Sequence, residues 1–390
     1  GIIEERMADS KIRVCRDDDM KLNEICEVYS GYALKAFNDA EDGFPVIKIG
    51  NIFMDGTLNL EECQYTTDGV NEKYYSQRGD IYIALSGATT GKIGIMDASE
   101  KYVINQRVGI VRQKSDDIPQ EYIKYFLLRQ TDRILQEAAG CAQPNISPRQ
   151  IAEYVVPDTS QEKMQEICEV LDRIKKIIDS RKVQISALDN LIKARFVEMF
   201  GDPVANEKGW TTKPLLDMGK CKNGMNFHYD DKGIEINCLG VGDFKNLSII
   251  DNTEELPTIL LNEMPSEEYL LKDDDIVFVR SNGNKALVGR SLAVYPGDVP
   301  TTFSGFCIRY RKHDNEITVP YLLRVLKTDS MRMKMAGRGA NIQNLNQQIL
   351  GTLVIPVPPV ELQNQFAAFV TEVNKSKVKV QKALDETQKL

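Results

Sequence analysis

The chain repeats itself after about two hundred residues, and this duplication constrains the fold more than any other feature of the sequence. The segment around Asn145 lies 199 positions before a similar segment around Asn344, and nearer the start of each repeat the offset falls to 195, between Asp80 and Asp275. A constant offset late in the repeat and a drifting one early indicate elements of fixed length at the end and variable loops before them. Further pairs at the 199-residue offset are Tyr122 with Tyr321, Pro157 with Pro356, and Ile167 with Phe366.

The early part of each repeat has the pattern of a mixed α+β domain. Short β-type runs such as 46–49, 81–85 and 108–111 are separated by glycine and aspartate, which are typical of turns. A helical stretch follows in each repeat, at 121–137 and at 321–335. We therefore expect two α+β domains in tandem.

The end of each repeat is predicted to be one long helix. From Met164 to Met199, apolar residues recur at alternating spacings of three and four, interrupted only by Arg181 and Arg195. This heptad seam predicts a helix that packs along a partner helix. The second repeat carries the same seam with a break at Lys377. The predicted seam residues are Ile167, Leu171, Ile174, Ile178, Ile185, Leu188, Ile192, Phe366, Val370, Val373, Val380 and Leu384.

The reach of the chain suggests how the two helices are arranged. A helix over 162–199 is ~57 Å long, whereas the connector 201–209 spans at most ~31 Å. The second domain must therefore begin near the far end of the first helix, and the second helix most simply returns antiparallel to the first. This places the two domains at opposite ends of a two-helix spacer, related by an approximate twofold. An ordinary pair of core helices in a larger fold is the alternative.

The composition excludes several classes of protein. With 42% hydrophobic residues in 390, the chain can build two or three folded domains. The eight cysteines include no Cys-x-x-Cys pair and there are only two histidines, so we expect reduced thiols and no zinc site. No apolar run approaches the roughly eighteen residues of a membrane span. We expect a cytoplasmic protein, and we interpret residues 1–19 as a charged N-terminal tail, with a stretch upstream of Met7 or Met20 as the alternative.

The net charge of −8 bears directly on any nucleic-acid function, since DNA-binding proteins usually gain affinity by neutralising phosphates. Residues 20–158 contain 14 Lys and Arg against 20 Asp and Glu, and residues 210–357 contain 17 against 18. Neither part is basic overall. A DNA-binding function therefore requires locally clustered cations or a partner that holds the duplex.

Several segments, taken in order, carry a family resemblance. They are Gly-Asp-Ile-Tyr-Ile-Ala-Leu-Ser-Gly at 79–87, Ile-Asn-Gln-Arg at 104–107, Gln-Pro-Asn-Ile at 143–146, Val-Val-Pro at 155–157 with Gln-Glu-Lys-Met-Gln-Glu-Ile at 161–167, and Met-Phe-Gly-Asp-Pro-Val at 199–204. Together they resemble the DNA specificity subunit of Type I restriction-modification systems, over nearly the whole chain from about residue 20.

The resemblance implies an architecture of two tandem mixed α/β target recognition domains, at 20–158 and 210–357. Two long antiparallel coiled-coil helices with pseudo-twofold symmetry would separate them. These conserved helical spacers would lie at 159–200 and 358–390, with a linker at 201–209.

The resemblance also implies partners. In the family, the helices set the spacing between two half-sites on double-stranded DNA and dock two adenine-N6 methyltransferase subunits, and restriction translocase subunits join the assembly. We therefore expect a non-catalytic targeting subunit without cofactors, and S-adenosylmethionine, ATP and Mg²⁺ on the partner subunits. Because residues 86–94 differ from residues 280–290, we expect an asymmetric, bipartite target.

Reading base edges requires Arg or Lys for guanine and Asn or Gln for adenine, placed on loops that enter a groove. For each candidate, a solvated turn residue without a ligand is the alternative. The predicted DNA-contacting residues of the first domain are Ser86, Thr89, Thr90, Lys92, Asn105, Gln106 and Arg107. Those of the second domain are Arg280, Ser281, Asn282, Asn284, Lys285 and Arg290.

Other functions have weaker support. Gly87 and Gly91 enclose three residues, where a phosphate-binding P-loop needs four. Asp158 and Glu162 could serve a nuclease only on neighbouring strands, whereas they lead into a helix start. We expect Trp210 to pack at the start of the second domain, and His228 and His313 to be surface or local hydrogen-bonding residues rather than ligands. A coiled-coil scaffold or protein-interaction module without DNA specificity is the alternative function.

Overall fold

The chain divides into two compact units, residues 1–176 and 177–390, and the boundary falls within the long helix α6 (Gln161–Phe200). The predicted N-terminal tail, 1–19, lies outside the described residues. Within the described part of the chain, no helix combines the length and apolar character needed to cross a membrane. The structure, a computed structural model, describes residues 20–39, 41–139, 144–227, 233–244, 249–336 and 344–389.

In the first unit, a four-stranded antiparallel sheet is buried on both faces. Ile81 and Ile83 belong to the core shared with the helices, whereas Tyr82 and Ala84 belong to the core shared with a smaller sheet, as the alternation of a strand requires. The larger sheet has the order β2 (Cys26–Ser30), β8 (Val108–Gln113), β5 (Ile81–Ala84) and β6 (Ile93–Ile95). The smaller has the order β4 (Gln64–Thr66), β3 (Phe44–Ile47) and β7 (Val103–Ile104), in which β3 and β7 are parallel.

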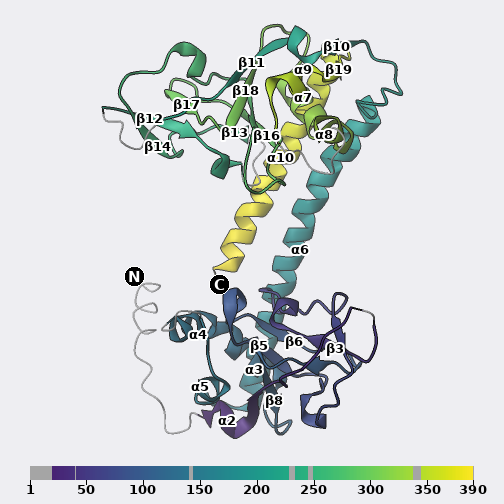
Figure 1. The fold of residues 1–390 in the computed structure, drawn as a ribbon, viewed down its shortest axis with the longest axis vertical. Helices are drawn as coiled ribbons and strands as arrows, with labels where there is room; N and C mark the ends of the chain where they lie inside the picture. Colours follow the sequence, from purple (N-terminus) through teal and green to yellow (C-terminus); the bar gives the residue numbers. More distant parts are fainter. Residues whose placement is uncertain are drawn as a thin grey trace. The chain divides into compact units, whose positions relative to one another are not determined.

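The second unit repeats this design (Figure 1). Ile276 and Phe278 face the helices, and Val277 and Val279 face the smaller sheet. The larger sheet has the order β11 (Gly219–Asn223), β18 (Cys307–Lys312), β15 (Asp275–Val279), β16 (Ser291–Val294) and β13 (Ile249–Ile250). The smaller has the order β14 (Thr258–Leu261), β12 (Ile234–Leu239) and β17 (Thr301–Phe303), in which β12 and β17 are parallel.

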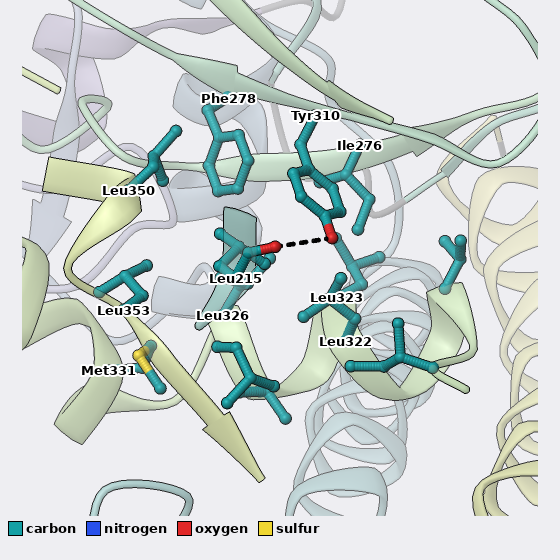
Figure 2. Packing of buried hydrophobic residues seen from close by; sticks show 14 of the residues in the cluster. Leu215, Ile276, Phe278, Tyr310, Leu322, Leu323, Leu326, Met331, Leu350 and Leu353 are labelled. Carbon is teal, nitrogen blue, oxygen red and sulfur yellow. Dashed lines mark hydrogen bonds between the residues drawn. The ribbon is translucent and has the colours of Figure 1, made fainter. Parts of the chain in front are cut away.

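Helices cover one face of each larger sheet. In the second unit, leucine side chains gather below Ile276 and Phe278, and the Tyr310 hydroxyl donates a hydrogen bond to the Leu215 carbonyl at 3.2 Å (Figure 2). The first unit has α2 (Leu22–Ile25), α3 (Gln120–Arg129), α4 (Thr131–Ala138) and α5 (Pro148–Ala152). The second unit has α7 (Val319–Leu326), α8 (Asp329–Ala336), α9 (Gln347–Gly351) and α10 (Val360–Gln388).

Short elements complete each unit. Two-stranded sheets pair β1 (Met20–Lys21) with β9 (Val155–Val156) and β10 (Thr212–Pro214) with β19 (Val354–Pro356). Single-turn 3₁₀ helices are η1 (Ile49–Asn51), η2 (Glu72–Tyr74), η3 (Gly87–Thr89), η4 (Leu215–Asp217), η5 (Val241–Asp243) and η6 (Glu267–Tyr269).

The helical stretches expected at 121–137 and 321–335 are confirmed, and each consists of two helices, α3 and α4 in the first unit and α7 and α8 in the second. The Thr131 hydroxyl donates to the Leu128 carbonyl at 2.9 Å, and the Thr328 hydroxyl donates to the Val325 carbonyl at 2.7 Å. A threonine side chain that bonds to a nearby carbonyl competes with the helical hydrogen bonds of the backbone. The break thus follows from side-chain chemistry that apolar periodicity does not record.

The repeated tyrosines anchor the exit to each long helix. The Tyr122 hydroxyl donates to the Pro157 carbonyl at 2.9 Å, and the Tyr321 hydroxyl donates to the Pro356 carbonyl at the same distance. These prolines precede α6 and α10, so each phenol fixes the point where the chain leaves the sheet domain.

Within the second unit, α6 packs along α10 in the opposite direction (Figure 1). Arg181 on α6 donates to the Ala383 carbonyl on α10. Asp189, later on α6, pairs with Lys377, which comes earlier on α10, so the two helices are antiparallel. Near the sheet domain, aromatic rings from α6, α7 and α10 meet. The rings are those of Phe196, Phe200, Tyr321 and Phe366, with centroids 4.7–5.8 Å apart.

The predicted seam residues lie on the less exposed side of their helices. By contrast Val183 and Val378, which lie off the seam, are each 67% exposed. Half-buried seam residues are Ile167, Leu171 and Ile174 in the first unit, and Ile178, Ile185, Leu188, Ile192, Val370 and Val380 in the second. Phe366, Val373 and Leu384 are buried.

Candidate nucleic-acid interface

In the first unit, three segments distant in sequence meet beside the end of β5. The Leu85 amide donates to the Arg107 carbonyl at 2.9 Å, and the Ile146 amide donates to the Leu85 carbonyl at 2.9 Å. Ser86 also forms a β-bridge with Asn145. The loop after β5, the turn before β8 and the segment before α5 are therefore held together by backbone hydrogen bonds. We call this meeting point the loop junction.

The second unit contains the same loop junction beside the end of β15. The Arg280 amide donates to the Phe306 carbonyl at 2.8 Å, and the Leu345 amide donates to the Arg280 carbonyl at 2.8 Å. The hydrogen bonds make Arg280 the counterpart of Leu85, and Phe306 the counterpart of Arg107. The equivalence rests on the backbone and is independent of side-chain similarity.

A glycine lets the first sheet strand approach each junction closely. A Cβ on Gly31 would lie 2.3 Å from the Ile104 carbonyl oxygen, and one on Gly224 would lie 2.0 Å from the Ser304 carbonyl oxygen. Both distances are shorter than any normal contact, so only glycine allows this approach. The end of β2 or β11 is thereby brought beside the turn that precedes β8 or β18.

The two junctions display different side chains on the same backbone. In the first unit, the junction forms an open pocket of about 360 Å³, lined by Ser30, Leu85, Ser86, Gln106, Arg107, Asn145, Ile146, Ser147 and Pro148. Gln106, Arg107 and Asn145 are exposed there. In the second unit, the counterpart of Arg107 is Phe306, whose side chain is 61% exposed.

The predicted residues of the first unit divide into two groups. Ser86, Gln106 and Arg107 come together at the junction. Thr90 and Asn105 are only 5% and 9% exposed; the Thr90 hydroxyl donates to the Gly87 carbonyl at 2.7 Å, and the Asn105 Oδ1 accepts from the Arg107 amide at 3.2 Å. In this structure both side chains are buried and hold turns in place.

The remaining two candidates of the first unit lie on the same loop. The Thr89 hydroxyl is buried without a hydrogen-bond partner among the described residues, and Lys92 is half-buried. Neither lines the pocket at the junction.

In the second unit, the predicted residues lie along one loop, 280–290. Arg280 Nη1 donates to the Gly305 carbonyl at 3.3 Å, which holds its guanidinium beside the turn that carries Phe306. Asn282 and Asn284 use their Oδ1 atoms to accept from backbone amides within the loop. Ser281 is half-buried, and Lys285 is exposed. Arg290 lies at the other end of the loop, where its Nη1 donates to the Phe244 carbonyl at 3.4 Å.

Asn145 and Phe306 are junction residues absent from the predicted DNA contacts. Asn145 stands in a segment that repeats at the 199-residue offset, which could have signalled it. Phe306 lies at the same offset from Arg107, but the phenylalanine side chain forms no hydrogen bonds and so carries no such signal.

Other candidate sites have local structural roles. No group of three His, Cys, Asp or Glu residues that could hold a metal ion occurs in the described ranges. Backbone and Ser160 hydrogen bonds lower the pKa of Glu162, as expected at a helix start. Trp210 donates through Nε1 to the Phe200 carbonyl at 3.0 Å and so packs against the end of α6. His313 is exposed, and His228 lies outside the described residues.

Relatives of known class match both repeats. The chain is 24% identical over 366 residues to the Type I restriction enzyme StySPI specificity subunit of Salmonella potsdam, which covers 87% of this chain and 77% of that protein. It is 22% identical over 382 residues to the putative type I restriction enzyme MjaX specificity subunit of Methanocaldococcus jannaschii, covering 89% of this chain and 84% of that protein.

Two solved structures share the fold. A chain described under complex assembly and conformational transition of the type I R-M system has a TM-score of 0.58 at 15% identity, with 95% of this chain and 93% of that chain covered. The S subunit of a Type I restriction-modification system from M. genitalium has a TM-score of 0.50 at 16% identity, with 97% and 95% covered.

The family model described as the Type I restriction modification DNA specificity domain matches residues 18–189 and 207–387, one match for each repeat. These matches cover more than half of the chain. The chain therefore belongs to the Type I restriction modification DNA specificity domain family.

Proposed function

We propose that the chain is the DNA specificity subunit of a Type I restriction-modification complex, in which each unit reads one half of an asymmetric, bipartite target. The observation that carries the proposal is the loop junction, which is built twice from the same backbone hydrogen bonds and displays different side chains in each unit. The same backbone arrangement with different side chains suits two domains that recognise different base sequences on one duplex.

The side chains at the junctions suit base edges in the major groove. In the first unit, Arg107 can donate two hydrogen bonds to guanine, and Gln106 and Asn145 can pair with adenine. In the second unit, Phe306 can contact a thymine methyl group, with Arg280 beside it as a guanine reader. The target recognition domains would comprise residues 20–158 and 210–357.

The long helices serve as spacer and docking surface in this proposal. The antiparallel contacts of α6 with α10 in the second unit support a spacer made of two antiparallel helices. We expect two adenine-N6 methyltransferase subunits there, with restriction translocase subunits joining the assembly. S-adenosylmethionine, ATP and Mg²⁺ would bind to those partners, and this chain would contribute no catalysis.

Sequence-dependent protection of DNA tests the proposal. The full chain is purified with and without its methyltransferase subunits, and a library of duplexes is footprinted with each preparation. We expect one bipartite site to be protected by the complex, with unprotected base edges between the halves. If the complex protects no sequence, the chain is a coiled-coil scaffold and not a reader of DNA.

A further inference from the structure

Arg309, in the middle of β18, is a buried cation without a partner among the described residues. Arg309 is 5% exposed, and its Nε is buried without a hydrogen-bond acceptor. The rest of its guanidinium also forms no hydrogen bond or ion pair with the described part of the chain. An arginine keeps its proton in proteins, so the charge is buried with the side chain. A buried charge without a counter-ion destabilises a fold.

The strand pairing shows where this guanidinium lies. Arg309 stands opposite Lys222 on β11 and opposite Val277 on β15. Opposite residues of antiparallel strands have their side chains on the same face. Val277 belongs to the core shared with the smaller sheet. The Arg309 side chain is therefore directed into the space between the two sheets of the second unit.

The two carboxylates that attract Arg309, those of Asp275 and Glu268, already have partners. Both oxygens of Asp275 accept hydrogen bonds from Arg311 at 2.7 Å. Glu268 pairs with Lys222 at 2.6 Å. Each of these pairs is neutral, which leaves the charge of Arg309 uncompensated. Burial accordingly lowers the pKa of Arg309, as expected for a cation in such a place.

The first unit shows that the fold does not need a cation at this place. The residue at the 199-residue offset is Ile110 on β8, which is fully buried in the core between the two sheets. Its opposite neighbours are the aromatic residues Tyr29 and Tyr82. The same backbone arrangement is therefore filled by apolar and aromatic side chains in one unit and contains a buried cation in the other. A ligand that only the second unit binds explains this difference.

Charge and burial indicate what the ligand is. One uncompensated positive charge requires one negative charge, which indicates a monovalent anion. A guanidinium as buried as that of Arg309 admits only a small ligand. The anion must also lose most of its water on entry, and this cost is lower for a weakly hydrated ion such as chloride than for phosphate.

We infer that the second unit binds a chloride ion between its two sheets, on the guanidinium of Arg309. The ion neutralises a charge that lies three residues after Phe306 of the loop junction. Chloride thereby stabilises the strand whose beginning holds that junction. The inference is independent of the proposed function, because it concerns the stability of the second unit and not its contact with DNA.

The first test locates the ion in crystals of the full chain grown in sodium bromide. Bromide substitutes for chloride, and its anomalous X-ray scattering distinguishes it from water. We expect a bromide ion in contact with the guanidinium of Arg309. Wild-type crystals without bromide at that position would overturn the inference, whatever any variant shows.

The second test measures thermal unfolding of the full chain while chloride replaces gluconate, a larger anion, at constant sodium concentration. The unfolding temperature should rise by about 3–6 °C when chloride reaches tenfold excess over its dissociation constant. R309I, which copies the first unit, should lose this dependence. The matched control K272Q should keep it, because Lys272 is exposed and pairs with Glu267 at 3.1 Å.

In gluconate, R309I should unfold at a temperature no lower than wild type, since Ile110 fills the same place in the first unit. R309Q carries the same prediction for chloride should R309I fail to fold. A chloride dependence that persists in these Arg309 variants would overturn the inference, because the anion would then bind elsewhere. Its loss in K272Q as well would also overturn it, because the effect would then be one of overall charge.

Discussion

Lys377 on α10 pairs with Asp189 on α6, its ammonium lying 2.7 Å from one carboxylate oxygen and 2.9 Å from the other. Lys377 is the residue that interrupts the predicted heptad seam of the second helix. An ion pair therefore occupies the place where the pattern calls for an apolar contact. A single polar pair in such a seam fixes the register of two helices at some cost in stability.

Removing one partner of this pair should cost more than replacing both. D189N leaves Lys377 near Lys327 without its carboxylate, and we expect a loss of about 1 kcal/mol, since both side chains are partly exposed. The double variant D189L/K377L restores an apolar seam and should be at least as stable as wild type. Urea unfolding measures both, and a double variant less stable than D189N would contradict the register argument.

The ion pair of Asp80 with Arg112 should be far more important to stability. Asp80 is 2% exposed and accepts two hydrogen bonds from the guanidinium, at 2.8 and 2.6 Å; Asp275 and Arg311 repeat the arrangement at 2.7 Å. D80N should cost about 3–5 kcal/mol, because it leaves a half-buried guanidinium without its anion.

The exposed pair of Lys101 with Glu72 provides the control for D80N. E72Q should change the free energy of unfolding by less than about 1 kcal/mol. Equal costs for D80N and E72Q would mean that the buried pair does not hold the first unit together.

Substitutions at the two junctions should affect different halves of the target. R107A should relax base specificity at one position of the first half-site, with a loss of about 1–3 kcal/mol in discrimination between bases. F306A should relax base specificity in the second half-site only. Binding to a set of single-base variants of the target measures this, with K101A as a surface control. A uniform loss of affinity across all variants would show that these side chains position the protein without reading bases.

Lys327 should make stability depend on pH. Its pKa falls from 10.5 to about 8 in the folded chain, so both states carry the charge below pH 8 and only the unfolded state keeps it above. The unfolded state then binds more protons, and the free energy of unfolding rises between pH 8 and about 10.5. K327M should be more stable than wild type near pH 7, and the difference should shrink as the pH rises. A difference that does not vary with pH would contradict the assigned pKa.

Periodic features could be predicted from the sequence because they repeat. The seam follows a heptad rule that residue types alone reveal, and the tyrosines at 122 and 321 stand at a fixed offset. The helix breaks at Thr131 and Thr328 could not be predicted in this way, because they depend on a hydroxyl reaching a carbonyl.

The loop junction was only partly predictable. Ser86, Gln106 and Arg107 could be predicted as site residues because their side chains can form hydrogen bonds to bases. Asn145 was missed because it reaches the junction through a β-bridge to Ser86, which no local sequence pattern encodes. Phe306 is identified by its backbone partner Arg280 and not by its residue type.

Mapping N6-methyladenine across a genome would show whether the two units read two different half-sites. The chain is expressed with its methyltransferase subunits, alone and with residues 210–357 exchanged for those of a relative. We predict one asymmetric bipartite motif with a fixed spacer, of which the exchange alters one half only. Methylation that persists unchanged when the chain is deleted would contradict this prediction.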